Sequence, residues 1–203
     1  MDTHILQTVI DERVGFRKKE SLAADYSSSH SSHSAHSCLA TGKRLFKRPE
    51  YQIRCFAVFL LGHAACELPE AIRFLETEVS TDPNWRVQEI LAMAFEHFYE
   101  TAGHLAVHAV FSKWLLHRNP NLRRAVTEGL RPWHARTQFR ENPSEAIAIL
   151  SCFRNDESEY VRKSAGNAIK DIGKRFPELV LRETRGWNLD DRHERQTWKH
   201  ATR

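Results

Sequence analysis

The stretch NWRVQEIL, residues 84–91, decides the fold because the way it opens a helix recurs at near-constant intervals along the chain. The same apolar position is Ile53 in YQIRC, Val87 in WRVQE, Leu122 in NLRRA and Val161 in YVRKS. The intervals of 34, 35 and 39 residues between these positions are typical of TPR, HEAT and armadillo solenoids, which are built from helix pairs. No segment shows sustained alternation of apolar and polar residues. We therefore predict an all-α protein, a HEAT-like helical-repeat solenoid.

The repeat register also predicts a row of side chains that share one face. Two residues after the shared apolar position, the chain carries Cys55, Glu89, Arg124 and Lys163. Residues four apart lie on the same side of a helix, so Trp85 precedes Glu89 by one turn. If the repeats stack, we expect one carboxylate with an aromatic neighbour, in a row that becomes basic. The alternative is that Trp85 packs between repeats and Glu89 is a solvated helix charge.

The length and charge of the chain set limits on its partners. Its 203 residues suffice for one compact domain or one short solenoid, and 41% hydrophobic with 28% charged residues fits a globular protein. Residues 1–112 hold 11 Lys and Arg against 14 Asp and Glu, whereas residues 113–203 hold 19 against 12. We expect the basic half to face a polyanion. The alternative is an excess charge spread around a solvated surface.

Neither a membrane span nor a metal site is predicted. The longest apolar run, residues 55–62, is far shorter than the roughly 18 to 20 residues that cross a bilayer. The first 16 residues lack a cationic start followed by an apolar block, so we expect no secretory signal and a cytoplasmic location. The four cysteines show no CxxC spacing, which indicates buried free thiols rather than zinc ligands: Cys38, Cys55, Cys66 and Cys152.

We predict a single domain with two parts. Residues 1–38 would form a helix to about residue 25 and a flexible Ser/His-rich loop at 26–37, and residues 39–203 would form the HEAT-like repeat domain. We do not expect His30, His33 and His36 to bind a metal, because no ordered shell flanks them. Prolines near the first turn of several segments support the predicted helices. These are 39–47, 50–65, 68–79, 84–101, 104–117, 120–132, 143–153, 157–174, 177–186 and 190–201.

Four separated segments match a known family in order. They are NWRVQEILAMAFEHF, NPNLRRAVTEGLRPW, NPSEAIAIL and DESEYVRKSAGNAIKDIGKRFPELV. Together they resemble the bacterial DNA alkylation repair proteins of the AlkD-like, HEAT-repeat superfamily, over roughly residues 40–200. The resemblance implies a stack of helix pairs whose basic concavity binds double-stranded DNA. The implied substrate is alkylated DNA.

The resemblance also assigns roles to individual residues. In active members, a carboxylate lies one turn after a tryptophan, beside the sugar of a damaged nucleotide. Trp85 and Glu89 match these positions, with glutamate where the namesake branch has aspartate. Arg124 matches a phosphate-contacting arginine. Asn167 stands where a second catalytic-site tryptophan is expected, and we expect it among the DNA-binding residues.

Further residues are expected to contact phosphate or to act as a second carboxylate at the same DNA-binding face. Phosphate contacts are expected from Arg123, Arg162 and Lys163, beside Arg124. Asp171 is a second candidate carboxylate, whose alternative interpretation is a helix acid paired with Lys174 or Arg175.

The chemistry explains why a carboxylate and an indole belong together. Alkylation at purine N3 or N7 makes the base cationic, so cleavage of the glycosidic bond develops positive charge on the deoxyribose. A fixed carboxylate stabilises that charge and orients water, and an indole face adds about 0.5 to 2 kcal/mol of cation–π attraction. The resemblance therefore implies a DNA glycosylase that needs no cofactor and no metal. The alternatives are a non-catalytic binder of damaged or branched DNA and a protein-binding scaffold.

Overall fold

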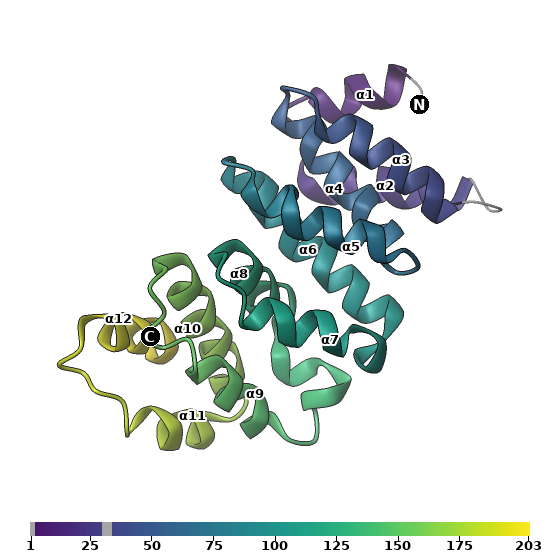
Figure 1. The fold of residues 1–203 in the computed structure, drawn as a ribbon. Coiled ribbons are helices and arrows are strands. Elements are labelled where there is room, and N and C mark those ends of the chain that lie inside the picture. The colour runs from purple at the N-terminus through teal and green to yellow at the C-terminus, as the bar shows by residue number, and fades with distance from the viewer. Residues whose placement is uncertain (1–2, 30–33) are drawn as a thin grey trace. The chain divides into compact units, whose positions relative to one another are not determined.

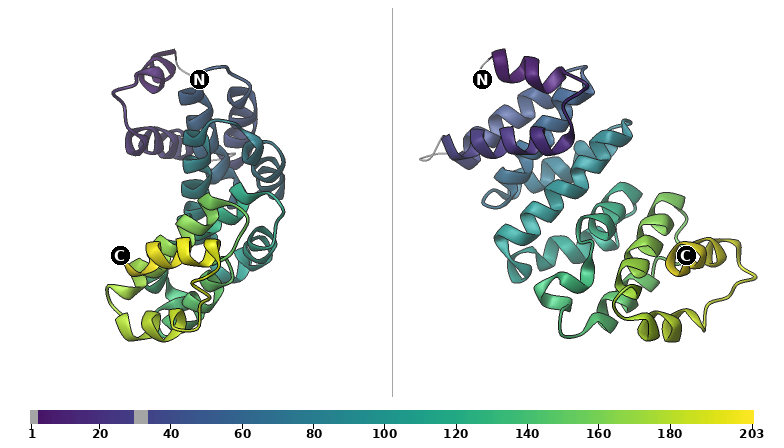
Figure 2. Two further views of the ribbon diagram at one scale, coloured as in Figure 1. Left: turned by 90° about the vertical axis from the view of Figure 1, so that its left-hand side faces the viewer. Right: turned by 180° about the vertical axis from the view of Figure 1, so that it is seen from behind.

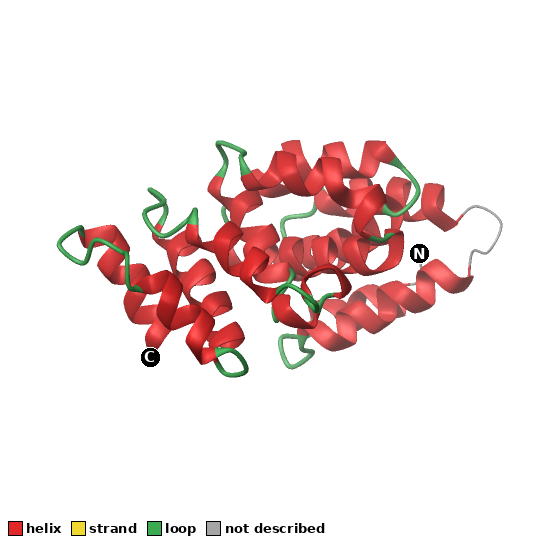
Figure 3. Cartoon of the chain, turned by 90° about the horizontal axis from the view of Figure 1, so that it is seen from below, coloured by secondary structure: helices red, strands yellow, loops and turns green. Residues whose placement is uncertain are grey.

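The computed structural model describes residues 3–29 and 34–203. Within these two ranges every regular element is a helix and no strand occurs (Figures 1 and 3). No helix of the described part is long and apolar enough to cross a bilayer. The structure therefore confirms the predicted all-α class and its helical repeats.

The chain divides into two compact units, Met1–Ala109 and Val110–Arg203, with α7 (His104–Leu115) spanning the division. The first unit contains α1 (Thr3–Ile10), α2 (Phe16–Ser29), α3 (Ser34–Phe46), α4 (Tyr51–Ala65), α5 (Pro69–Thr77), the 3₁₀ turn η1 (Val79–Thr81) and α6 (Trp85–Ala102). The second contains α8 (Pro120–Gly129), the 3₁₀ turns η2 (Trp133–Ala135) and η3 (Thr137–Phe139), α9 (Pro143–Ser151), α10 (Glu159–Gly173), α11 (Pro177–Thr184) and α12 (Arg192–Thr202).

In the first unit, α4 is the central helix. It packs against α1, α2, α3, α5 and α6, and its side chains from Cys55 to Leu61 are all buried. This explains why residues 55–62 are apolar all round the helix rather than along one stripe. At Gly62, an added Cβ would lie 2.9 Å from the Cβ of Ala94, so glycine is required where α4 meets α6.

In the second unit, α10 lies between α8 and α12 and also contacts α9 and α11 (Figures 1 and 2). Gly166 permits the close approach of α12, since an added Cβ would lie 2.6 Å from the Cβ of His200 and 2.8 Å from the carbonyl of Thr197. Thr197 in turn donates a hydrogen bond of 2.6 Å to the carbonyl of Arg154. The terminal helix is thus tied to the turn before α10.

The helices predicted from residue 39 onward are all present, and most of their ends fall within two or three residues of the prediction. Prolines open α5, α8, α9 and α11, as expected for residues that lack an N–H. The helix predicted over 120–132 ends earlier, at Gly129, because Pro132 follows and disfavours helical backbone at the residue before it.

The prediction for the N-terminal 38 residues was wrong in two respects. Instead of one helix to about residue 25, α1 and α2 are separated by residues 11–15. The predicted loop at 26–37 is helical wherever it is described, because α2 continues to Ser29 and α3 already begins at Ser34. Small side chains supply the missing apolar surface, since Ala23, Ala35 and Cys38 are buried. The domain boundary at residue 38, which α3 crosses, stays a prediction.

Five helices share the repeat register, and we call them the row helices: α4, α6, α8, α10 and α12. The shared apolar positions of the first four, at residues 53, 87, 122 and 161, are fully buried. Each row helix begins after an N-cap residue: Glu50, Asn84, Asn119, Ser158 and Asp191. The intervals found in the sequence are therefore intervals between structurally equivalent helix starts.

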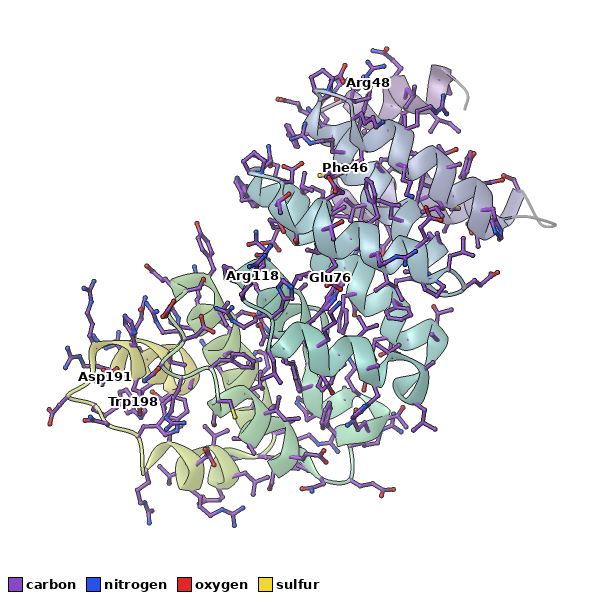
Figure 4. All side chains as sticks on the ribbon, viewed as in Figure 1. Phe46, Arg48, Glu76, Arg118, Asp191 and Trp198 are labelled. Atoms are coloured by element: carbon purple, nitrogen blue, oxygen red, sulfur yellow. The ribbon has the colours of Figure 1, made fainter. Side chains whose placement is uncertain are left out.

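One side chain in each row helix, four residues after the N-cap, holds the turn that precedes the helix. These side chains are Arg54, Gln88, Arg123, Arg162 and Arg195. Each donates to the carbonyl two residues before its N-cap, namely those of Arg48, Asp82, His117, Asp156 and Leu189. Arg48 and Asp191 are labelled in Figure 4 at the turns before α4 and α12. The arrangement satisfies carbonyls that the helix itself leaves unbonded.

Two of these arginines also link successive row helices. Arg54 donates to Asp82 over 2.6 and 3.3 Å, and Arg123 donates to Asp156 over 2.7 Å from each of two nitrogens. Each aspartate also accepts from the backbone N–H two residues ahead, at the N-cap of the next row helix. One carboxylate therefore joins an arginine of one repeat to the helix start of the next.

We expect Asp156→Asn to lower the free energy of unfolding by about 3 to 5 kcal/mol, because Arg123 would lose the counter-ion of a buried pair. The two side chains are only 9% and 14% exposed. Chemical denaturation measures the change. The matched control is Asp11→Asn, which breaks a pair with the 89% exposed side chain of Arg13 and should cost at most about 1 kcal/mol. Equal losses in the two variants would contradict the structural role.

Candidate functional site

Trp85 and Glu89 occupy adjacent turns at the start of α6. Trp85 is the first residue of the helix, behind the N-cap Asn84, whose side-chain oxygen accepts from the N–H of Arg86 at 2.9 Å. The indole is 57% exposed, whereas Glu89 is half-buried. The exposure of Trp85 argues against the alternative in which it packs between repeats. The predicted carboxylate with an aromatic neighbour is present in the first unit.

An arginine that the sequence analysis missed completes this cluster. The guanidinium carbon of Arg86 lies 4.5 Å from the ring centroid of Trp85 and 5.1 Å from that of Tyr51. Both aromatics are the first residue of a row helix, so the repeat register places them side by side. We call Tyr51, Trp85 and Arg86 the aromatic–guanidinium stack. Its signal in the sequence was an aromatic at the same register position in two repeats, followed in one of them by arginine.

In the second unit, Arg124 and Lys163 hold the equivalent position on α8 and α10, which pack against each other. Lys163 is exposed and Arg124 half-buried. Burial, and then the charge of Lys163, lower the pKa of His200 on α12. Asn167 is half-buried, one turn after Lys163. Because Glu89 belongs to the first unit, a single face shared by Glu89, Arg124 and Lys163 stays a prediction.

Arg123 and Arg162 have other partners in the structure. Arg123 is bonded to Asp156 and to the turn before α8, and Arg162 is only 5% exposed. Two nitrogens of Arg162 donate to the side-chain oxygen of Gln196 at 3.0 and 2.6 Å. These bonds occupy the guanidinium groups within the fold, which argues against the phosphate contacts expected of them.

The secondary candidate carboxylate, Asp171, is part of an ion-pair network. It accepts from Arg131 at 2.6 and 2.9 Å and from Lys174 at 2.7 Å. Arg131 also pairs at 2.7 Å with Glu128, which accepts from the hydroxyl of Ser164 at 2.8 Å. Burial raises the pKa of Asp171, but the hydrogen bonds and charges of Lys174 and Arg131 outweigh it and lower the pKa below its ordinary value. The pairing with Lys174 is the alternative that the sequence analysis gave.

A basic hollow of about 480 Å³ lies beside this network in the second unit. Its walls include Arg131, Lys174 and Arg175, together with Asp171 and His134. Burial and the neighbouring charge of Arg175 lower the pKa of His134. The walls carry three cations and one carboxylate, and two of the cations, Arg131 and Lys174, are already paired with Asp171.

Metal ligation finds no support in the residues that the structure describes, where no group of three or more His, Cys, Asp or Glu side chains is placed to hold an ion. His36 lies in α3. His30 and His33, the other two histidines of the predicted loop, fall outside the described residues.

The first unit carries an exposed tryptophan one turn before a carboxylate, and the second unit carries basic side chains at the equivalent register position. The sequence profile described as DNA alkylation repair enzyme matches residues 16–182 of the chain. The chain belongs to this family. The profile begins at the first residue of α2, so the match includes the end of α2 and the start of α3, which the sequence analysis had taken for a loop.

Two solved structures are similar over almost the whole chain. AlkD2 from Streptococcus mutans is 37% identical, with a TM-score of 0.89 over 98% of this chain and 96% of that one. The crystal structure of smu.31 from Streptococcus mutans UA159 is 36% identical, with a TM-score of 0.87 and the same coverage. The uncharacterized protein YhaZ of Bacillus subtilis strain 168 is 36% identical over 94 residues, which are 44% of this chain but only 26% of that relative.

We expect Asp171→Asn to lower the melting temperature at neutral pH, because it removes the charge that holds Arg131 and Lys174. Since the pKa of Asp171 is lowered in the folded state, its stabilisation is present above the unfolded-state pKa of about 4 and is lost as pH falls through the lower, folded-state value. Thermal unfolding from pH 7 to about pH 2 should show the two proteins converging. Asp190→Asn, at an exposed carboxylate, should match the wild type throughout. A difference at Asp171 that persists at the lowest pH would contradict this role.

Proposed function

We propose that this protein is a DNA glycosylase of the alkylation repair family, which hydrolyses the glycosidic bond of N3- or N7-alkylated purines in double-stranded DNA. The observation that carries the proposal is the half-buried Glu89, one turn from the exposed indole of Trp85. A cationic base is already a good leaving group, so the protein must mainly stabilise the positive charge that develops on the sugar. Water is then the only co-reactant.

Glu89 has the properties that this step needs. It stands in the first turns of a helix whose start is held by Gln88, which donates to the carbonyls of Val79 and Asp82 at 2.9 and 2.8 Å. Partial burial strengthens the interaction of a carboxylate with a cation compared with bulk water. The exposed face of Trp85 offers a second attraction for the same cation.

The DNA backbone would be bound by the basic second unit. We assign phosphate contacts to Arg124 and Lys163, which stand at equivalent positions on packed helices, and to the basic hollow beside Arg131. Contacts to phosphate position the duplex without reading its sequence. The same proposal includes a cytoplasmic location and no requirement for a cofactor.

The second candidate function is DNA binding without cleavage. It is favoured by the aromatic–guanidinium stack, because the guanidinium of Arg86 lies 4.5 Å from the ring of Trp85. That ring already makes a cation–π contact with Arg86, so less of its surface is available to a sugar cation. Asn167 in place of the second indole points the same way. An excision assay distinguishes the two functions directly.

Glu89→Gln should reduce release of 7-methylguanine and 3-methyladenine from methylated duplex DNA by about 10²-fold or more, because it removes the charge that opposes the sugar cation. DNA affinity should be retained, since glutamine keeps the size and hydrogen-bonding capacity of the side chain. Base release is measured by chromatography, and affinity by fluorescence anisotropy.

The matched control is Glu100→Gln, the same change at an exposed position near the other end of α6, which should leave excision unchanged. Equal excision by the wild type and Glu89→Gln would remove Glu89 from the mechanism. No excision of either base by the wild type would select the second candidate function.

Affinity for duplex DNA should fall steeply with salt, with a logarithmic slope of about −0.9 for each phosphate that is neutralised. Arg124→Ala should weaken binding to all duplex sequences alike and make the slope less steep by about one such step. Arg182→Ala, at an exposed position on α11 outside the row helices, serves as the control and should have a smaller effect. Affinity that responds neither to salt nor to Arg124→Ala would argue for a protein-binding scaffold.

A further inference from the structure

A second hollow lies in the first unit, between the turn that joins α1 to α2 and the first halves of α4 and α6. Its volume is about 290 Å³, close to the lower end of the about 300 to 1,000 Å³ found for small-molecule sites. Phe16 and Tyr51 provide aromatic walls, and Cys55 and the cations Lys19 and Arg86 also line the hollow. We call this hollow the Lys19 pocket.

Lys19 is a buried cation without a carboxylate partner among the described residues. The side chain is 3% exposed, and its ammonium donates to the backbone carbonyl of Val14. Asp11, the acid whose charge acts on it, is paired with Arg13 at 2.7 Å. The thiol of Cys55 gives no counter-charge, because burial raises its pKa to about 12. An ammonium has three N–H donors, and only one of those of Lys19 has an acceptor among the described residues. Because a buried charge is normally paired, the other two donors are available to an anion that the chain itself does not supply.

Arg86, which also lines the Lys19 pocket, has a side chain that two aromatic rings hold in place. Its guanidinium lies 5.1 Å from the Tyr51 ring and 4.5 Å from the Trp85 ring, and no described residue accepts a hydrogen bond from it. Stacking fixes the plane of the group while leaving its five N–H donors unused. A fork of this kind suits an anion with several oxygens, such as a phosphate.

We propose that the Lys19 pocket binds a phosphomonoester, the terminal phosphate of a nucleic acid strand or of a free nucleotide. Two cations match the charge of about −1.5 to −2 that a phosphomonoester carries at neutral pH. A phosphodiester inside a duplex is flanked by sugars on both sides and stays at the surface, whereas a terminal phosphate can enter far enough to meet the buried ammonium of Lys19. The carboxylate of Glu12, at the exposed edge of the pocket, opposes the same anion.

The experiment compares ligands that differ only in the phosphate. Calorimetric titration of the wild type uses inorganic phosphate, deoxyadenosine 5′-monophosphate and deoxyadenosine, and anisotropy compares a duplex bearing 5′-phosphates with the same duplex bearing 5′-hydroxyls. Saturable binding of the monophosphate but not of the nucleoside, or tighter binding of the 5′-phosphorylated duplex, supports the pocket. The first result identifies a free nucleotide and the second a strand terminus. If neither is seen, the proposal is overturned.

Variants locate the binding in the Lys19 pocket. Lys19→Met keeps the length of the side chain, removes the charge and should weaken phosphate-dependent binding at least tenfold, as should Arg86→Gln. Lys18→Met, at the exposed neighbour on α2, should change it little, and Glu12→Gln should tighten it. Equal loss in Lys18→Met and Lys19→Met would place the effect elsewhere and overturn the proposal.

Two further measurements separate this site from protein stability and from excision. Lys19→Met should melt at the same or a higher temperature than the wild type, because it removes an unpaired buried charge, so any loss of binding is not unfolding. Its excision of methylated purines should be unchanged, since Lys19 has no part in the proposed cleavage step. The proposal for the Lys19 pocket can therefore fail while the glycosylase proposal stands, and the glycosylase proposal can fail while the pocket proposal stands.

Discussion

The hydrogen bonds from the side chain four residues after each N-cap to the preceding turn are the constraint on which the rest of the structure depends. They fix the residue at which every row helix begins. Once the first residue of a row helix is fixed, the register also fixes which residue lies at the first helical position and which lies five residues after the N-cap. Tyr51 and Trp85 share the first position, and Glu89, Arg124 and Lys163 share the second. The register of the candidate site is thus a consequence of how turns are held.

This constraint divides the cations of the chain into two kinds. Arg54, Arg123 and Arg162 are largely buried and spend their N–H donors on carbonyls and on the next repeat. Lys163 and Arg86 keep donors that the fold does not require. A count of Lys and Arg in the sequence therefore overstates the number of cations that the surface offers to a polyanion. The two residues proposed to contact phosphate, Arg124 and Lys163, each follow one of these structural arginines by one position.

The fold was largely predictable because prolines, N-cap residues and the repeated apolar position are local signals. The helices around residue 30 were not, since Ala23, Ala35 and Cys38 pack through small surfaces that leave no apolar stripe. Neighbours such as Arg123 and Arg124 look alike in the sequence, yet a rotation of about 100° per residue gives them different surroundings. The aromatic–guanidinium stack forms only where two repeats are in contact, so no single segment of the sequence predicts it.

Cys55 brings a chemical property to the wall of the Lys19 pocket. With its pKa raised to about 12, on the order of one thiol in 10⁵ is ionised at neutral pH, and the thiolate is the nucleophilic form. Methylating agents are electrophiles that attack such nucleophiles wherever they find them. Burial raises the pKa of this thiol by more than nearby cations such as Lys19 lower it, so the thiol stays protonated and weakly nucleophilic although it lines a pocket.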